Sequence, residues 1–146
     1  MCSSIGSAVG ASALCDFSLV FPPDPGWVRA AREAVRAALC AAGREGLVDT
    51  ALLLTSEVVT NAVKACRSSG CSAPVTLYAE WTGPGTLRVL VQDGAPGVPC
   101  WGRAAGDEEG GRGLLLVGAW ADEWGVCRHV PGVGKAVWFE VAEKGR

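Results

Sequence analysis

The feature that most constrains this fold is a long stretch with one apolar face. Apolar residues recur at helical spacing from Leu47, and Gly70 follows the last of them, which predicts a helix over about Leu47–Arg67. A helix with a single apolar face must bury that face against a second layer. The stripe consists of Leu47, Ala51, Leu54, Val58, Ala62 and Cys66.

Segments with the alternating pattern of β-strands can supply that second layer. A first helix begins at Asp24-Pro25, as N-cap and first helical residue, and ends at Gly43, and a short helix over Gly113–Ala121 comes late in the chain. The order of elements predicts an α+β fold, a two-layer sandwich with a mixed, mostly antiparallel sheet and helices on one face. The expected strands are 16–21 at an edge, Val75–Trp81 and Thr86–Gln92 joined by a hairpin turn at 82–85, and two more near 123–129 and 136–141.

Length and composition predict one domain. The chain has 146 residues, of which 49% are hydrophobic, enough for a single core. We expect residues 1–15 to be a disordered leader and 16–146 to form one domain. A net charge of −2 argues against a nucleic-acid partner, because such proteins carry basic stripes. The first fifteen residues lack the basic start of a signal peptide, and charges interrupt the apolar stretches, so we expect a cytoplasmic protein with no membrane partner.

The cysteines do not indicate a metal site or a disulfide framework. There are seven, an odd number, without a C-x-x-C pair, and His129 is the only histidine. The plain interpretation is reduced, mostly structural thiols. Cys66 and Cys71 flank a Ser-Ser-Gly turn and could be oxidised together, although nothing in the sequence itself argues that they are.

Three polar residues share one face of the long helix. Glu57 and Asn61 stand four residues apart, and Lys64 continues the same face at the next turn. Asn is a mediocre helix former, so its presence here hints at a role other than folding. Glu and Asn oxygens suit a hard cation such as Mg²⁺, or a carboxylate base beside a metal ligand. From spacing alone a solvated polar face is the simpler interpretation.

A carboxylate stands where an apolar strand ends. Asp93 follows Val89–Gln92, and the Gly/Pro turn 94–97 comes directly after it. Such a residue places one carboxylate at the mouth of a core and lets a flat ligand approach the backbone. Taken alone, the pattern also fits an ordinary Asp-Gly turn, which is the favoured interpretation.

A glycine-rich segment leads into the short late helix. Gly110–Val117 contains Arg112, and a helix N-terminus of this kind presents free N–H groups and a positive dipole end to an anion such as phosphate. The dinucleotide fingerprint is absent, because the third glycine and the preceding strand are missing. The P-loop is absent as well, because Gly134-Lys135 is followed by Ala136.

Together, the order of these motifs resembles the Bergerat ATP-binding fold of gyrase, Hsp90, histidine kinases and MutL. The likeness spans about residues 16–142 and is greatest to the single-domain anti-sigma-factor serine/threonine kinases, many of them actinobacterial. The strings that carry it are Ser56–Val63 and Gly110–Val117, followed by Ala121–Val126 and Gly134–Trp138.

The resemblance implies roles for the helix and for the strand end. Asn61 would bind the Mg²⁺ that bridges the ATP phosphates, and Glu57 matches the family's catalytic carboxylate, which deprotonates the attacking hydroxyl. Lys64 would lie near the phosphates. Asp93 would accept a hydrogen bond from the adenine amino group, and Gly97 would let base and sugar lie against the backbone.

The resemblance also assigns the glycine-rich segment. Residues 98–110 would act as a lid over the nucleotide. The phosphates would be held by Gly111, Arg112, Gly113 and Leu114, where the late helix starts. The implied cofactors are therefore ATP and Mg²⁺.

The function implied is an ATP-dependent protein serine/threonine kinase of the anti-sigma-factor type. Its partners would be an anti-sigma-factor antagonist, phosphorylated on serine, and a sigma factor or similar regulator; a homodimer is left open. The alternative is a non-catalytic ATP-binding switch that sequesters a partner, supported by Ala95 and Ala136 where the family often has Gly and Thr. A detached histidine-kinase catalytic domain is a third hypothesis, against which Glu57 stands, because such domains usually have Asn there.

Overall fold

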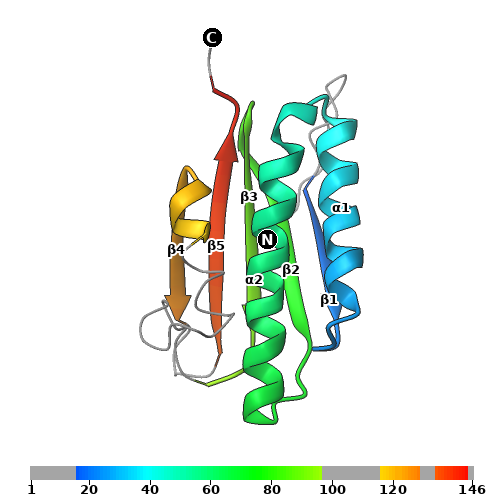
Figure 1. Ribbon diagram of the computed structural model, residues 1–146, viewed down its shortest axis with the longest axis vertical. Helices are drawn as coiled ribbons and strands as arrows, with labels where there is room; N and C mark the ends of the chain where they lie inside the picture. The colour runs from blue at the N-terminus through cyan, green and yellow to red at the C-terminus, as the bar shows by residue number, and fades with distance from the viewer. Residues whose placement is uncertain (1–15, 97–115, 129–133, 145–146) are drawn as a thin grey trace.

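The computed structural model describes residues 16–96, 116–128 and 134–144 (Figure 1). Its sheet has five strands in the order β1-β2-β3-β5-β4, and every neighbouring pair is antiparallel. Residues 116–120 are helical as well. The elements are β1 (Phe17–Phe21), α1 (Trp27–Ala41), the 3₁₀ turn η1 (Glu45–Leu47), α2 (Val48–Ser69), β2 (Val75–Gly83), β3 (Thr86–Asp93), β4 (Glu123–Arg128) and β5 (Lys135–Ala142).

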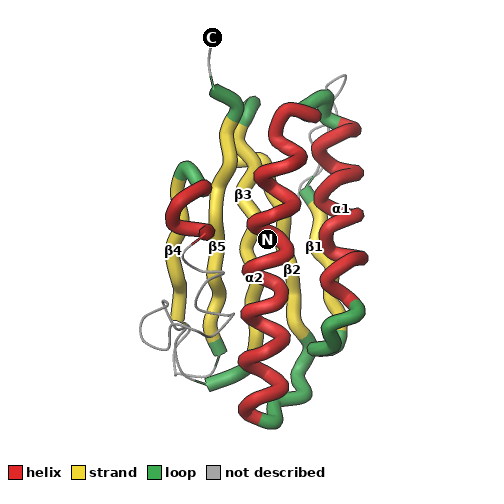
Figure 2. Tube along the Cα trace, viewed as in Figure 1, coloured by secondary structure: helices red, strands yellow, loops and turns green. Residues whose placement is uncertain are grey.

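The two long helices lie side by side over one face of the sheet (Figure 2). α2 packs on the central strands β2, β3 and β5, and α1 packs against α2. This confirms the predicted α+β sandwich with its helices on one face. β1 is an edge strand, as its short length and the following Pro22-Pro23 predict.

The predicted apolar stripe of α2 is buried against the sheet. Leu54 and Cys66 are both 0% exposed, and the other stripe residues also belong to the core. Gly70 ends the helix in the left-handed conformation at φ 75°, and Gly43 does so after α1 at φ 72°. Both helix ends therefore follow the prediction.

The start of α1 differs from the prediction. The helix begins at Trp27, after a turn in which the Trp27 N–H donates to the Asp24 carbonyl. Asp24 Oδ1 accepts from the Gly26 N–H at 2.8 Å, and Gly26, not Asp24, is the N-cap. The Trp27 ring stacks on Phe21 at 5.7 Å between centroids, which fixes the turn against the end of β1.

The inward faces of β3 and β5 form a ladder of paired residues beneath the helices. Residues directly opposite each other in an antiparallel pair point to the same side of the sheet. The pairs, from one end to the other, are Leu87/Val141, Val89/Phe139, Val91/Val137 and Asp93/Lys135. Three apolar pairs are thus followed by one charged pair, and all eight residues are buried.

By length and composition alone, the segment Glu45–Ser69 is apolar enough to cross a membrane. This finding differs from the expectation that charges interrupt every apolar stretch before it is long enough to span a membrane. Within this segment, 56% of the most apolar 18-residue stretch is buried inside the domain. A buried core helix of a globular domain has the same length and composition. Length and composition alone are therefore weak evidence that this segment spans a membrane.

Candidate functional site

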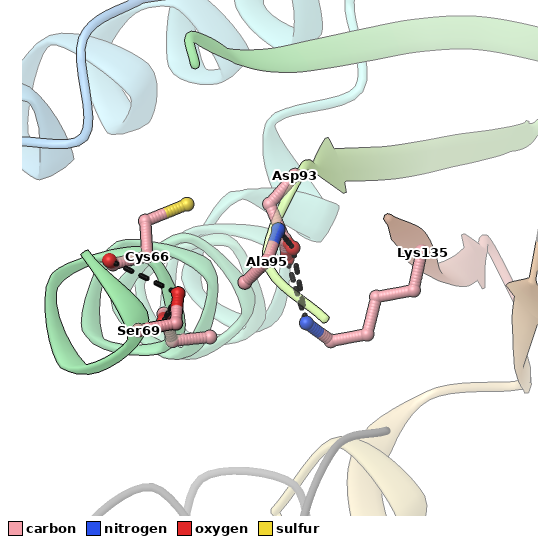
Figure 3. A network of polar contacts seen from close by, with 6 residues as sticks. Cys66, Ser69, Asp93, Ala95 and Lys135 are labelled. Atoms are coloured by element: carbon pink, nitrogen blue, oxygen red, sulfur yellow. Dashed lines mark hydrogen bonds and ion pairs between the residues drawn. The ribbon is translucent and has the colours of Figure 1, made fainter. Parts of the chain in front are cut away.

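The charged pair at the end of the ladder is the centre of the candidate site. Lys135 Nζ lies 3.0 Å from both carboxylate oxygens of Asp93, and each side chain is 2% exposed (Figure 3). Charges are almost never buried to this degree unless they are paired. The ammonium group therefore compensates the negative charge of Asp93 inside the core.

The backbone around Asp93 holds the carboxylate in one orientation. The Ala95 N–H donates to Asp93 Oδ1 at 2.9 Å, so the side chain closes a tight turn over its own strand end. On β5, Gly134 has φ +86°, and an added Cβ there would lie 2.6 Å from the Asp93 carbonyl oxygen. Only glycine permits this close approach of the two strands.

Within the described part of the chain, the hydrogen bonds to the Asp93 carboxylate leave it some acceptor capacity. An ionised carboxylate offers about four lone-pair sites. Oδ1 accepts from Ala95 and Lys135, whereas Oδ2 accepts from Lys135 alone among the hydrogen bonds of the described residues. The lone pairs of Oδ2 would therefore allow it to accept from a donor such as an exocyclic amino group in addition to Lys135.

Sequence reasoning missed Lys135. Gly134–Trp138 carries part of the family resemblance and lacks the P-loop pattern, but the positive charge for the phosphates was expected at Lys64 and Arg112. A signal was present, because Lys135 is in phase with Val137, Phe139 and Val141, the inward residues of an alternating strand. A lysine at such a position must find a buried counter-ion, and Asp93 is its register partner.

Helix α2 carries the predicted polar face. Glu57 and Asn61 are half-buried one turn apart, and Lys64 is exposed. Residues four apart on a helix have Cβ atoms about 5–6 Å from one another. Because Glu57 and Asn61 are partly buried, they do not belong to a fully solvated helix face. Their roles stay predictions.

The remaining predicted residues lie outside the described part of the chain. They are Gly97, the segment 98–110, and Gly111, Arg112, Gly113 and Leu114. Of the expected late helix, residues 116–120 are described, and Val117 is buried in the core. The phosphate-binding prediction for this segment therefore stays a prediction.

The residues described by the structure limit how a metal could be held. Among them, no group of three or more His, Cys, Asp or Glu side chains is arranged so that it could hold a metal ion. Mg²⁺ commonly needs only one or two protein ligands when phosphates and water complete its shell. The amide oxygen of Asn61 fits that requirement, with Glu57 one turn away.

Two cysteines lie beside the Asp93 turn. Burial, and then the negative charge of Asp93, raise the pKa of the Cys66 thiol above its ordinary value of 9.0. Cys71 is half-buried, and its Sγ lies 3.3 Å from where a Cβ on Gly94 would be. The end of α2 is thus in contact with the same turn that fixes the carboxylate.

Comparisons with known proteins agree with the fold. A family model described as a histidine kinase-like ATPase domain matches residues 21–141. The crystal structure of the RsbU and RsbW domains of Rv1364c from Mycobacterium tuberculosis is similar in fold, with a TM-score of 0.62 and 19% identity. The match covers 87% of this chain and 31% of that one, so this chain spans about a third of its length. No curated protein matches significantly.

Proposed function

The chain belongs to the histidine kinase-like ATPase domain family, and from this membership we propose that it is an ATP-dependent protein serine/threonine kinase of the anti-sigma-factor type. Its protein substrate would be an anti-sigma-factor antagonist, and a sigma factor or similar regulator would be its second partner. The similar crystal structure includes an RsbW domain, which supports this choice of partners. We also propose a cytoplasmic location.

The observation that carries the proposal is the carboxylate of Asp93. Among the described residues its Oδ2 accepts only from Lys135, which leaves this oxygen an acceptor position. In our proposal this oxygen accepts a hydrogen bond from the adenine amino group. Lys135 and the Ala95 N–H hold the acceptor still, so binding requires little reorganisation.

Helix α2 would supply the groups for phosphoryl transfer. Glu57 is half-buried and in our proposal takes the proton of the attacking serine hydroxyl. Asn61, on the same face, would hold Mg²⁺, and bound Mg²⁺ neutralises charge on the phosphates. Phosphoryl transfer depends mainly on positioning and charge neutralisation, so a site with few groups suffices. Lys64 and Arg112 would add positive charge near the phosphates.

A substitution at Glu57 separates chemistry from binding. The Glu57→Gln protein should bind Mg²⁺-ATP with unchanged affinity and should transfer no label from γ-labelled ATP to an antagonist protein. Glu80, a half-buried carboxylate on β2, offers a matched control, and Glu80→Gln should retain both properties. Full transfer by Glu57→Gln would contradict the proposed role.

The second candidate function is a non-catalytic ATP-binding switch. Ala136 stands where the family often has a threonine, and its place between the inward residues Lys135 and Val137 turns its methyl group to the face opposite Asp93, so it adds no hydrogen bond to nucleotide binding there. A switch protein would bind ATP and change its affinity for a partner without transferring phosphate. Label transfer by the wild-type protein would therefore exclude this alternative.

A further inference from the structure

Cys66 and Cys71 are brought together by the way α2 ends. The Cys71 N–H donates to the Cys66 carbonyl at 2.9 Å, across Gly70 in its left-handed conformation. The hydrogen bond closes a six-residue loop at the helix end, and an apolar contact between the side chains at its two ends frequently accompanies this motif. Here both are cysteines, and Cys71 is near enough to contribute to the raised pKa of the Cys66 thiol.

Both thiols also contact the turn that follows Asp93. The Gly94 N–H is close enough to the Cys66 thiol to oppose the rise in its pKa, and the Cys71 sulfur lies 3.3 Å from the position that a Cβ on Gly94 would take. Figure 3 shows the Cys66 side chain at the end of α2, beside Asp93 and Ala95. Gly94 is the residue between Asp93 and Ala95, whose N–H holds the carboxylate. Any movement of the sulfurs is therefore transmitted to the carboxylate turn.

Formation of a disulfide requires such a movement. A disulfide joins its sulfurs at about 2.05 Å, far closer than two thiols that share a hydrogen bond. That approach shifts at least one sulfur relative to Gly94. Because Gly94 precedes Ala95, whose N–H donates to Asp93 Oδ1, such a shift changes the position of one of the two groups that hold the carboxylate.

We propose that Cys66 and Cys71 are a redox site whose oxidation to a disulfide weakens nucleotide binding at Asp93. The proposal rests on the proposed ATP-binding function. The oxidant is a peroxide. The reduced dithiol is the binding-competent state, and a dithiol reductant restores it.

The chemistry balances with hydrogen peroxide as the oxidant. Cys71 is half-buried and meets the oxidant first, whereas Cys66 is fully buried. The Cys71 sulfur attacks one peroxide oxygen, the O–O bond breaks, and a sulfenic acid and one water form. The Cys66 sulfur then attacks the Cys71 sulfur, the S–O bond breaks, and the leaving oxygen departs as a second water with the Cys66 proton. Each cysteine loses one hydrogen, and the peroxide is reduced to two waters.

A variant that keeps only this pair of cysteines tests the proposal. Its other five cysteines are replaced by serine: Cys2, Cys15, Cys40, Cys100 and Cys127. The matched control carries Cys71→Ser in addition. Both proteins are titrated with Mg²⁺-ATP by calorimetry before and after treatment with hydrogen peroxide, and intact mass reports the loss of two hydrogens.

We expect the pair-only protein to form the disulfide and to bind ATP roughly tenfold to a hundredfold more weakly, the range for losing one hydrogen bond to a charged group. Dithiothreitol should restore binding, and the Cys71→Ser control should not respond to peroxide. Absence of the disulfide would overturn the proposal, as would a disulfide with unchanged affinity, or one that abolishes the folded far-ultraviolet circular dichroism. Failure of the reduced protein to bind ATP would instead refute the proposed function on which this inference rests.

Discussion

Replacing Lys135 by methionine tests the buried pair at the centre of the site. Methionine keeps most of the length of the side chain and removes its charge, leaving the Asp93 carboxylate buried without a counter-ion. Both Nζ–O distances are 3.0 Å and both side chains are 2% exposed, so the pair has the geometry of a fully buried ion pair. Removing one partner of such a pair costs about 3–5 kcal/mol.

Arg88 offers a matched control on the neighbouring part of the sheet. Its guanidinium bonds Glu140 at 2.8 Å and lies 5.2 Å from the Trp138 ring centroid, but the two charged side chains are 37% and 16% exposed. Exposed pairs contribute about 0–1 kcal/mol, so Arg88→Met should cost roughly 1 kcal/mol. The contrast between the Lys135 and Arg88 variants therefore isolates the effect of burial.

The assay is urea unfolding of both variants, followed by tryptophan fluorescence and circular dichroism, with stability taken from the midpoint at equal slope. A typical domain is stable by about 5–15 kcal/mol, so Lys135→Met should lose a large part of its stability. A double variant with Asp93→Asn should cost less than the sum of the two single changes, because the unpaired charge is gone. A cost for Lys135→Met no larger than that for Arg88→Met would refute the reasoning.

Three further predictions follow from the same contacts. Gly134→Ala should lower the free energy of unfolding by about 2 kcal/mol or more, because its Cβ would meet the Asp93 carbonyl oxygen at 2.6 Å in addition to the strain of a positive φ. Gly43→Ala, with φ +72° and open space around it, should cost only the strain of about 1 kcal/mol, and equal costs in denaturant would contradict the close approach. Asp93→Asn should weaken ATP binding in calorimetry by roughly tenfold or more, since the charged acceptor is lost. The Cys66 thiol has a raised pKa in the folded protein, so as pH rises the unfolded chain loses this proton before the folded protein does, and the free energy of unfolding should fall above pH 9.0. In unfolding curves recorded at increasing pH, Cys66→Ala should reduce that fall.

Much of the fold was predictable because local patterns agree with the packing. The stripe on α2 is buried as its helical spacing predicts. Gly43 and Gly70 end their helices because glycine adopts the left-handed backbone conformation of a helix C-terminus without strain. The N-terminus of α1 was less predictable. Stacking of Trp27 on Phe21 and the turn at Asp24 are tertiary and local effects that shift the helix start within the usual uncertainty of such boundaries.

The candidate site was only partly predictable. Asp93 was identified by its place at a strand end, but the same pattern also fits an ordinary turn, and the side chain in fact closes that turn through Ala95. Its partner Lys135 comes from a strand that lies 42 residues further along the chain, and only the antiparallel register brings the two together. The contact of Cys66 and Cys71 with Gly94 has the same origin, because packing of α2 on β3 is invisible in either segment alone.

The most direct measurement of the central claim is calorimetric titration of the reduced wild-type protein with Mg²⁺-ATP and with Mg²⁺-GTP. Adenine presents an amino donor where guanine presents a carbonyl acceptor. A fixed carboxylate oxygen should therefore bind ATP and reject GTP by about a hundredfold or more. Equal affinity for the two nucleotides, or binding of neither, would contradict the assignment of Asp93 as the group that recognises adenine.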